Sequence, residues 1–135
     1  MLGQSPKQTE ADPAALLPWL KDVILRTEDS RTTDIKVRLR GNILHVLCES
    51  VSAELPKDYV LMRLVRSLME PATKARLEAE FPEVHQVYVY NRRDQAAKPV
   101  WSAPIYLNRL ARHLTRLVEG AEDSQLAAKV IQRSA

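Results

Sequence analysis

The stretch that decides the fold is IKVRLRGNILHVLCE, residues 35–49. Apolar and polar side chains alternate on both sides of Gly41-Asn42, and a period of two is typical of a β-strand with two different faces. A Gly-Asn pair suits a two-residue hairpin turn, because glycine accepts positive φ at the first turn position. The hairpin is therefore predicted to pair Arg40 with Ile43 and, at its far end, Ile35 with Cys48.

This register sorts the side chains of the hairpin into two faces. The apolar face holds Ile35, Val37, Leu39, Leu44, Val46 and Cys48. The opposite face holds Lys36, Arg38, Arg40, Ile43, His45 and Leu47. A slip by one residue would bury the three cations, so the register is strongly specified.

A third alternating run, VYVYNR, spans residues 87–92. If its valines face the core with the apolar side of the hairpin, then Tyr88, Tyr90 and Arg92 join the polar face. Residues 100–107 are predicted to add an edge strand. Pro104 is tolerated there because an edge strand has unpaired amides.

Helical spacing of apolar residues appears in four further segments, at residues 12–24, 56–69, 72–81 and 108–134. Asp12 and Asn108 are expected to cap the first and the last of these helices. The predicted fold class is α+β, with the order α-β-β-α-α-β-(β)-α. In this two-layer sandwich a small antiparallel or mixed sheet of three or four strands packs against helices. Residues 1–11 are expected to be a disordered lead-in, and residues 12–135 a single domain.

The bulk properties favour an ordinary soluble protein. The chain has 135 residues, a formal net charge of +3 and a pI of about 9.2, a mild excess that permits an anionic partner without demanding one. Its single cysteine, Cys48, excludes an internal disulfide and fits a reducing compartment. No apolar stretch approaches the length that a membrane span needs, and residues 1–10 lack the apolar centre of a secretory signal. These observations predict a cytoplasmic protein.

The pattern resembles a short α-β-β-α-β domain that occurs in many uncharacterised cyanobacterial proteins. The residues that carry the resemblance are the helix at Leu16-Leu17, the strand at 35–37, the turn at Gly41-Asn42, residues 44–50, and residues 87–90 followed by Trp101. It covers residues 13–107. The resemblance implies a cyanobacterial source and a non-catalytic module without an assigned activity.

Residue patterns that support catalysis or cofactor binding are missing from the sequence. The three histidines, His45, His85 and His113, are dispersed, and Cys48 has no thiol partner, so no metal site is predicted. The glycines are isolated and form no phosphate loop. Cys48 is expected to face the core as an inert thiol. We therefore expect a protein that is not an enzyme, with no catalytic residues and no cofactor. The least favoured alternative is an enzyme whose site residues are too far apart in the sequence to recognise, and a convergent pocket of polar groups would support it.

The polar face of the predicted sheet is the main candidate binding surface. Its candidate residues are Lys36, Arg38, Arg40, Ile43, His45, Leu47, Tyr88, Tyr90 and Arg92. Aromatic anchors beside arginine are typical of protein interfaces, whereas cations beside aromatic rings are also the ingredients of single-strand nucleic-acid platforms. A plain solvated strand face is the alternative to both, since alternating cations also discourage edge-to-edge aggregation. Ile43 and Leu47 need a cover, which either the last helix or another chain supplies.

The element order is also similar to that of K-homology RNA-binding domains. Those domains clamp backbone phosphates with a Gly-X-X-Gly loop between two helices. Here the equivalent residues 69–74 read MEPATK, with no glycine and an added acid. A shared fold would therefore not imply that binding mode.

The last predicted helix is a second candidate interaction site. Leu107, Leu110, Leu114, Leu117 and Ala121 follow a 3-4-3-4 spacing. This stripe either packs on the protein's own sheet or forms a dimer seam or a groove-docking helix. The candidate residues here are Arg109, Leu110, Arg112, Leu114, Arg116 and Leu117.

Together these patterns predict a non-enzymatic adaptor or regulatory module that binds another macromolecule. A protein partner, including a second copy of the chain, is the leading prediction. Binding of RNA or single-stranded DNA through the same basic, tyrosine-bearing face is the alternative.

Overall fold

The computed structural model describes residues 11–25, 33–51, 55–93 and 96–120. A 3-10 turn, Pro13–Leu16, leads into α1 (Leu17–Ile24), and the hairpin follows as β1 (Thr33–Arg40) and β2 (Ile43–Ser50). Next come α2 (Lys57–Met69), α3 (Pro71–Glu80), β3 (Gln86–Arg93) and β4 (Trp101–Tyr106). A second 3-10 turn, Leu107–Arg109, precedes the final helix, which the structure describes over residues 110–120. The predicted α+β sandwich and its element order are confirmed.

The sheet has four strands in the order β1-β2-β3-β4. β1 pairs with β2 antiparallel, β2 with β3 parallel, and β3 with β4 antiparallel, so the sheet is mixed. The parallel pair results from the crossover through α2 and α3, because parallel neighbours need a long connection. The strand predicted for residues 100–107 is present as β4, at an edge of the sheet and with Pro104 inside it.

The register of the hairpin agrees with the prediction at every pair from Arg40↔Ile43 to Ile35↔Cys48. Gly41 has φ +60°, the left-handed conformation that the turn requires of its first residue. The apolar side of the sheet therefore faces the helices, and Leu44, Val46 and Val89 on it are completely buried.

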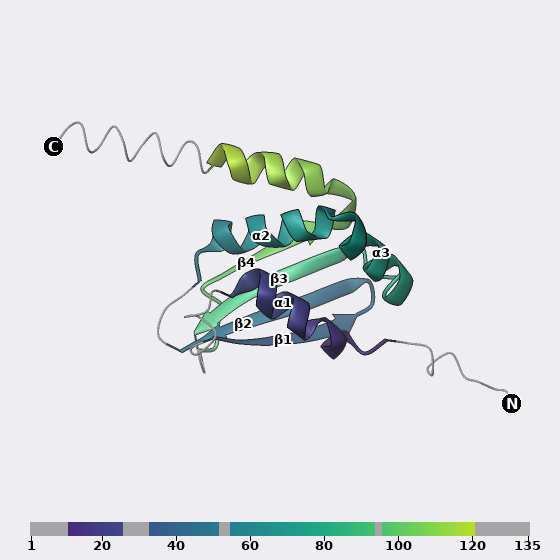
Figure 1. The fold of residues 1–135 in the computed structure, drawn as a ribbon. Helices are drawn as coiled ribbons and strands as arrows, with labels where there is room; N and C mark the ends of the chain where they lie inside the picture. The colour runs from purple at the N-terminus through teal and green to yellow at the C-terminus, as the bar shows by residue number, and fades with distance from the viewer. Residues whose placement is uncertain (1–10, 26–32, 52–54, 94–95, 121–135) are drawn as a thin grey trace, which may run out of the picture.

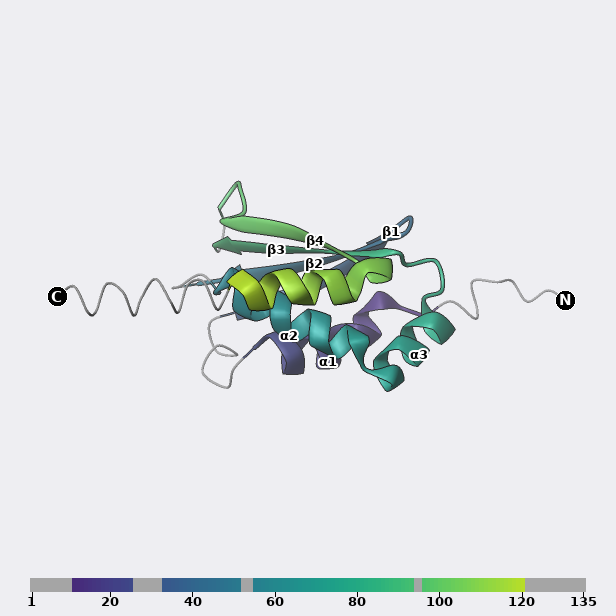
Figure 2. The ribbon, with the colours of Figure 1, turned by 90° about the horizontal axis from the view of Figure 1, so that it is seen from above.

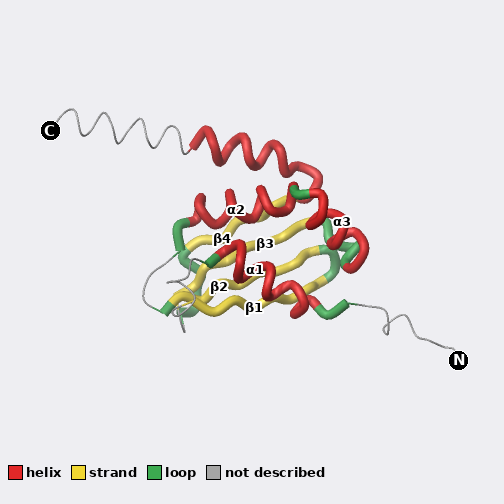
Figure 3. Tube along the Cα trace, viewed as in Figure 1, coloured by secondary structure: helices red, strands yellow, loops and turns green. Residues whose placement is uncertain are grey.

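The helices lie on one side of the sheet. Figure 2 shows α1, α2 and α3 below the strands, with the final helix beside α2, and Figure 3 shows the same two layers by element type. The core between the layers contains Leu20, Leu64 and Phe81, each 2 % exposed or less. No described helix covers the opposite side of the sheet (Figures 1 and 2).

Of the two helix caps predicted from the sequence, one is present and the other is not. Asp12 caps the first turn as predicted, because its Oδ1 accepts a hydrogen bond from the Ala14 N–H at 2.9 Å. Asn108 does not cap the final helix: it lies inside the 3-10 turn, which begins after Tyr106 without a side-chain cap. Of the lead-in predicted at residues 1–11, only Ala11 is described, and it packs against the core. Residues 1–10 and residues 121–134 of the last predicted helix lie outside the described part of the chain.

Candidate binding surface on the outer face of the sheet

The side of the sheet that no described helix covers is called the outer face below. The strand registers arrange its side chains in a regular grid. From β1 to β4, its rows are Arg40, Ile43, Gln86 and Tyr106; Arg38, His45, Tyr88 and Pro104; Lys36, Leu47, Tyr90 and Ser102; and Asp34, Glu49 and Arg92. All nine residues predicted for this surface are in the grid. The parallel pairing of β2 with β3 places the tyrosines directly beside His45 and Leu47.

Three rings form an aromatic cluster at the centre of the outer face, namely His45, Tyr88 and Tyr90. The ring centroids of Tyr88 and Tyr90 are 4.8 Å apart, and the His45 ring stacks on Tyr90 at 5.8 Å with an interplanar angle of 19°. His45 Nδ1 and the Tyr90 hydroxyl oxygen are joined by a hydrogen bond of 2.9 Å. These contacts hold the three half-exposed rings in one arrangement before any partner binds.

The rings of the aromatic cluster are uncharged at neutral pH, although they lie beside the positively charged strand β1. Burial, followed by the charges of Arg40 and Arg38, lowers the pKa of His45 below its ordinary value of 6.5. Burial, with Tyr88 as a second cause, raises the pKa of the Tyr90 phenol above its ordinary value of 10.0. At neutral pH the rings therefore present polar atoms without a charge.

Glu49, which was not among the predicted surface residues, pairs with two of the four cations of the outer face. Glu49 Oε1 lies 2.7 Å from Lys36 Nζ, and its Oε2 lies 2.5 Å from a guanidinium nitrogen of Arg92. The hydrogen bond from Lys36, then that from Arg92, lowers the pKa of Glu49. Among the described residues, neither Arg38 nor Arg40 forms an ion pair, so the positive charge that is available to a partner lies on β1.

A shallow cavity of about 490 Å³ lies over this boundary between cations and rings. Its walls are formed by Lys36, Val37, Arg38, Arg40, His45, Leu47 and Tyr90. Six of these seven residues belong to the predicted surface. The structure therefore brings the basic strand and the aromatic cluster together, while Ile43, Tyr88 and Arg92 lie beside the cavity in the same grid.

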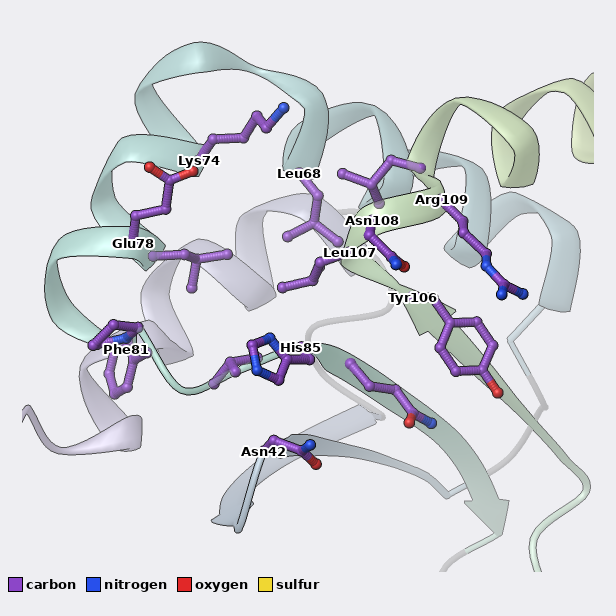
Figure 4. A pocket seen from close by; sticks show the side chains of 15 residues that line it. Asn42, Leu68, Lys74, Glu78, Phe81, His85, Tyr106, Leu107, Asn108 and Arg109 are labelled. Carbon is purple, nitrogen blue, oxygen red and sulfur yellow. The ribbon is translucent and has the colours of Figure 1, made fainter.

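A larger cavity of about 730 Å³ at one end of the sheet was not predicted. Figure 4 shows its wall of side chains from α3, the loop before β3, the end of β4 and the start of the final helix. Leu77 and Phe81 give it an apolar floor, while Lys74, Glu78 and Arg109 carry charges of both signs at its rim. Its lining residues range from Asn42 to Leu110, and no short sequence pattern could connect them.

The second predicted site, on the final helix, is largely used inside the chain. Leu110 is buried, and Leu107, Leu114 and Leu117 pack against the core, so the leucine stripe stabilises this protein's own fold. Arg109 lies over the Tyr106 ring at 5.6 Å. Arg112 and Arg116 are exposed.

The single cysteine of the chain, Cys48, is completely buried in the core. Burial raises the pKa of the Cys48 thiol to about 12, which leaves it protonated and unreactive at neutral pH. Among the described residues no cluster of His, Cys, Asp and Glu could hold a metal ion. No helix within the described ranges is both long and apolar enough to cross a membrane.

Comparisons with protein-family models, with curated proteins and with solved structures find no match to this chain. The function proposed below therefore depends on the geometry and chemistry of the chain's own residues.

Proposed function

We propose that this protein is a non-enzymatic binding module that docks a protein partner on the outer face of its sheet. The observation that carries this proposal is the aromatic cluster, held half-exposed beside Leu47 on a sheet face that no described helix covers. Next to it lie Arg38 and Arg40, which form no ion pair with any described residue. Tyrosine and arginine are enriched among the residues that dominate binding energy at protein interfaces.

The position of the core supports a binding role for the outer face. The helices already bury most of one face of the sheet, which supplies the core, so folding does not require aromatic and aliphatic side chains on the other. Ile43, Leu47, Tyr88 and Tyr90 nevertheless lie there, bordered by the charged residues of β1 and by Glu49 and Arg92. An apolar centre with a polar rim is the usual layout of a protein interface.

A site-specific photo-crosslinking experiment tests this proposal in the native cell. A photoreactive amino acid replaces Leu47 on the outer face or, as the control, the exposed Lys21 on α1. We expect a covalent adduct with a defined protein from position 47 and none from position 21. Tyr90→Ala should weaken capture about thirtyfold, because truncating an interface hot spot costs about 2 kcal/mol.

The identity of the adduct separates the remaining outcomes. An adduct with a second copy of the chain would make the module a homo-oligomer, and light scattering of the purified protein would then give a dimer mass that Leu47→Glu returns to that of the monomer. Equal adducts from positions 47 and 21, or none from position 47, would contradict the proposal.

Single-stranded nucleic-acid binding is a second candidate, and the specific observation in its favour is the stacking cluster beside Arg38 and Arg40. Against it, Glu49 engages the other two cations of the face. Phosphate contacts make affinity fall steeply with salt, whereas an apolar-centred protein contact changes little. A gel-shift series over salt with mixed-sequence oligonucleotides, repeated with Arg38→Glu and Tyr90→Ala, decides this. The absence of a shift at low salt would remove the nucleic-acid candidate.

A further inference from the structure

Strand β1 is an edge of the sheet with one unpaired side. Among the described residues it pairs only with β2, and Figure 1 shows it at the border of the sheet farthest from β4. Residues that flank a two-residue turn form a hydrogen-bonded pair, and such pairs alternate with non-bonded ones along an antiparallel ladder. Because Arg40 and Ile43 flank the turn, the backbone N–H and C=O groups of Leu39, Val37 and Ile35 point away from β2.

The side chains along this edge differ above and below the sheet. On the outer face, Arg38 and Arg40 are exposed cations, and Lys36 is already held by Glu49. On the inner side, Ile35 is buried at 3 % exposure, whereas Val37 and Leu39 remain half-exposed although they pack against the core. The helix layer therefore leaves the inner side of β1 incompletely covered toward the hairpin turn.

We infer that β1 receives an extended segment of a partner protein as an added strand, in which acidic residues alternate with apolar residues. This inference rests on the proposed protein-binding function and names its mode. The added backbone would pair with the outward groups of Leu39, Val37 and Ile35. Its acidic side chains would lie beside Arg38 and Arg40, and its apolar side chains would cover Val37 and Leu39.

The charges on β1 also affect whether it pairs with β1 of a second copy of the chain. If two copies paired through β1 around a two-fold axis at Val37, Lys36 of each copy would lie opposite Arg38 of the other. Like charges directly opposite each other destabilise the centre of such a pair, whereas Asp34 of each copy would lie opposite Arg40 of the other at its two ends. A purely acidic and apolar strand meets Arg38 and Arg40 without the repulsion at Lys36 and Arg38, and is therefore the better match. The other edge, β4, includes Pro104, which has no N–H to donate.

The test uses the full-length protein and a synthetic probe peptide in which Glu alternates with Val. Amide hydrogen exchange is followed residue by residue by NMR as the peptide is added. We expect the amides of Ile35, Val37 and Leu39 to gain protection of about tenfold or more, because a new ladder removes them from solvent. The amides of Lys36, Arg38 and Arg40 already face β2 and serve as the internal control.

Two matched controls separate strand addition from simple charge attraction. N-methylation of the peptide at one alternating set of residues should abolish binding while N-methylation of the other set is tolerated, since only one set directs its amides at β1. The double variant Arg38→Glu, Arg40→Glu should lose affinity for the Glu-Val peptide by about tenfold and gain it for a Lys-Val peptide.

Each outcome decides between the two proposals. No protection at Val37 and Leu39, or equal effects of the two N-methylated sets, would overturn strand addition and leave the charges on β1 as a guard against aggregation. If position 47 still cross-links to a protein in that case, the binding function stands and only its mode is wrong. If neither peptide nor cellular partner engages the outer face, both proposals fail.

Discussion

The two faces of the sheet are made by the same strands and differ in what they must do. On the inner face, Leu44 and Val87 are 1 % exposed or less and contact the helix layer. On the outer face, the neighbouring residues His45 and Tyr88 are half-exposed and contact each other. The inner face is buried under the helix layer, whereas the rings of the outer face contact one another and remain partly open to solvent.

This difference shows how a small domain separates stability from recognition. Strand alternation commits every second residue to the core, and the residues between are free to vary without creating a cavity. Substitutions on the inner face should therefore act on unfolding, and those on the outer face on binding. The predictions below test that division.

A matched pair of leucines on β2 should show the largest contrast. Leu44→Ala removes a side chain that is completely buried, and we expect a loss of about 3 kcal/mol in the free energy of unfolding. Leu47→Ala, three residues along the same strand, should cost less than about 1 kcal/mol, because water already reaches this half-exposed site. Urea denaturation of the two variants measures both values. A loss at Leu47 as large as that at Leu44 would mean that another part of the chain covers the outer face.

The inner face contains a polar exception at Asn91, which is completely buried. Its side-chain N–H groups donate to the Cys48 carbonyl and to Ser50 Oγ at 3.0 Å each, and its Oδ1 accepts from the Leu55 N–H at 3.0 Å. Asn91→Ala would strand these groups without partners, and we expect a loss of about 2 kcal/mol.

The control for Asn91 is Gln86, an amide on the same strand that belongs to the outer face. Gln86→Ala should change the free energy of unfolding by less than about 0.5 kcal/mol. Faster hydrogen exchange at the Leu55 amide in Asn91→Ala would locate the damage. Equal losses in the two variants would contradict the separation of the faces.

The sequence predicts the hairpin completely because the information is local. Alternation and the positive φ that Gly41 supplies together leave one register that keeps the cations in solvent. The direction of β3 is not predictable in the same way, since a strand with one buried face alternates identically in parallel and antiparallel pairs. The crossover through α2 and α3 decides it.

The ion pair that joins β2 to β3 on the outer face could not be predicted from the sequence, because it depends on the parallel pairing of these two strands. Glu49 meets Arg92 only because β2 and β3 are parallel and in this register. Only the three-dimensional structure therefore shows that Arg38 and Arg40 have no ion-pair partner within the described ranges, whereas Lys36 and Arg92 do. The prediction of Asn108 as a cap was wrong for a related reason: the chain turns out of β4 through a 3-10 turn, and a cap residue alone does not locate the first helical turn.

The smallest expected effect concerns the protonation of the His45 imidazole on the outer face. In NMR titration of its imidazole, the pKa should lie below the ordinary value of 6.5. Arg38→Gln or Arg40→Gln should raise this pKa only part of the way back, because burial is the largest cause and the arginines follow.

The same shift has a defined sign for stability. A histidine whose pKa is lower when folded binds fewer protons than the unfolded chain, so stability falls as the pH falls from 6.5 toward the folded pKa. His113, whose pKa is lowered by burial and then by Arg116 and Arg109, acts in the same direction. The contribution of His45 is therefore the difference between the wild type and His45→Gln, whose stability should decline less on acidification. A His45 pKa at or above 6.5 would contradict this prediction, because burial and the charges of Arg40 and Arg38 would then not outweigh the groups that favour the protonated ring.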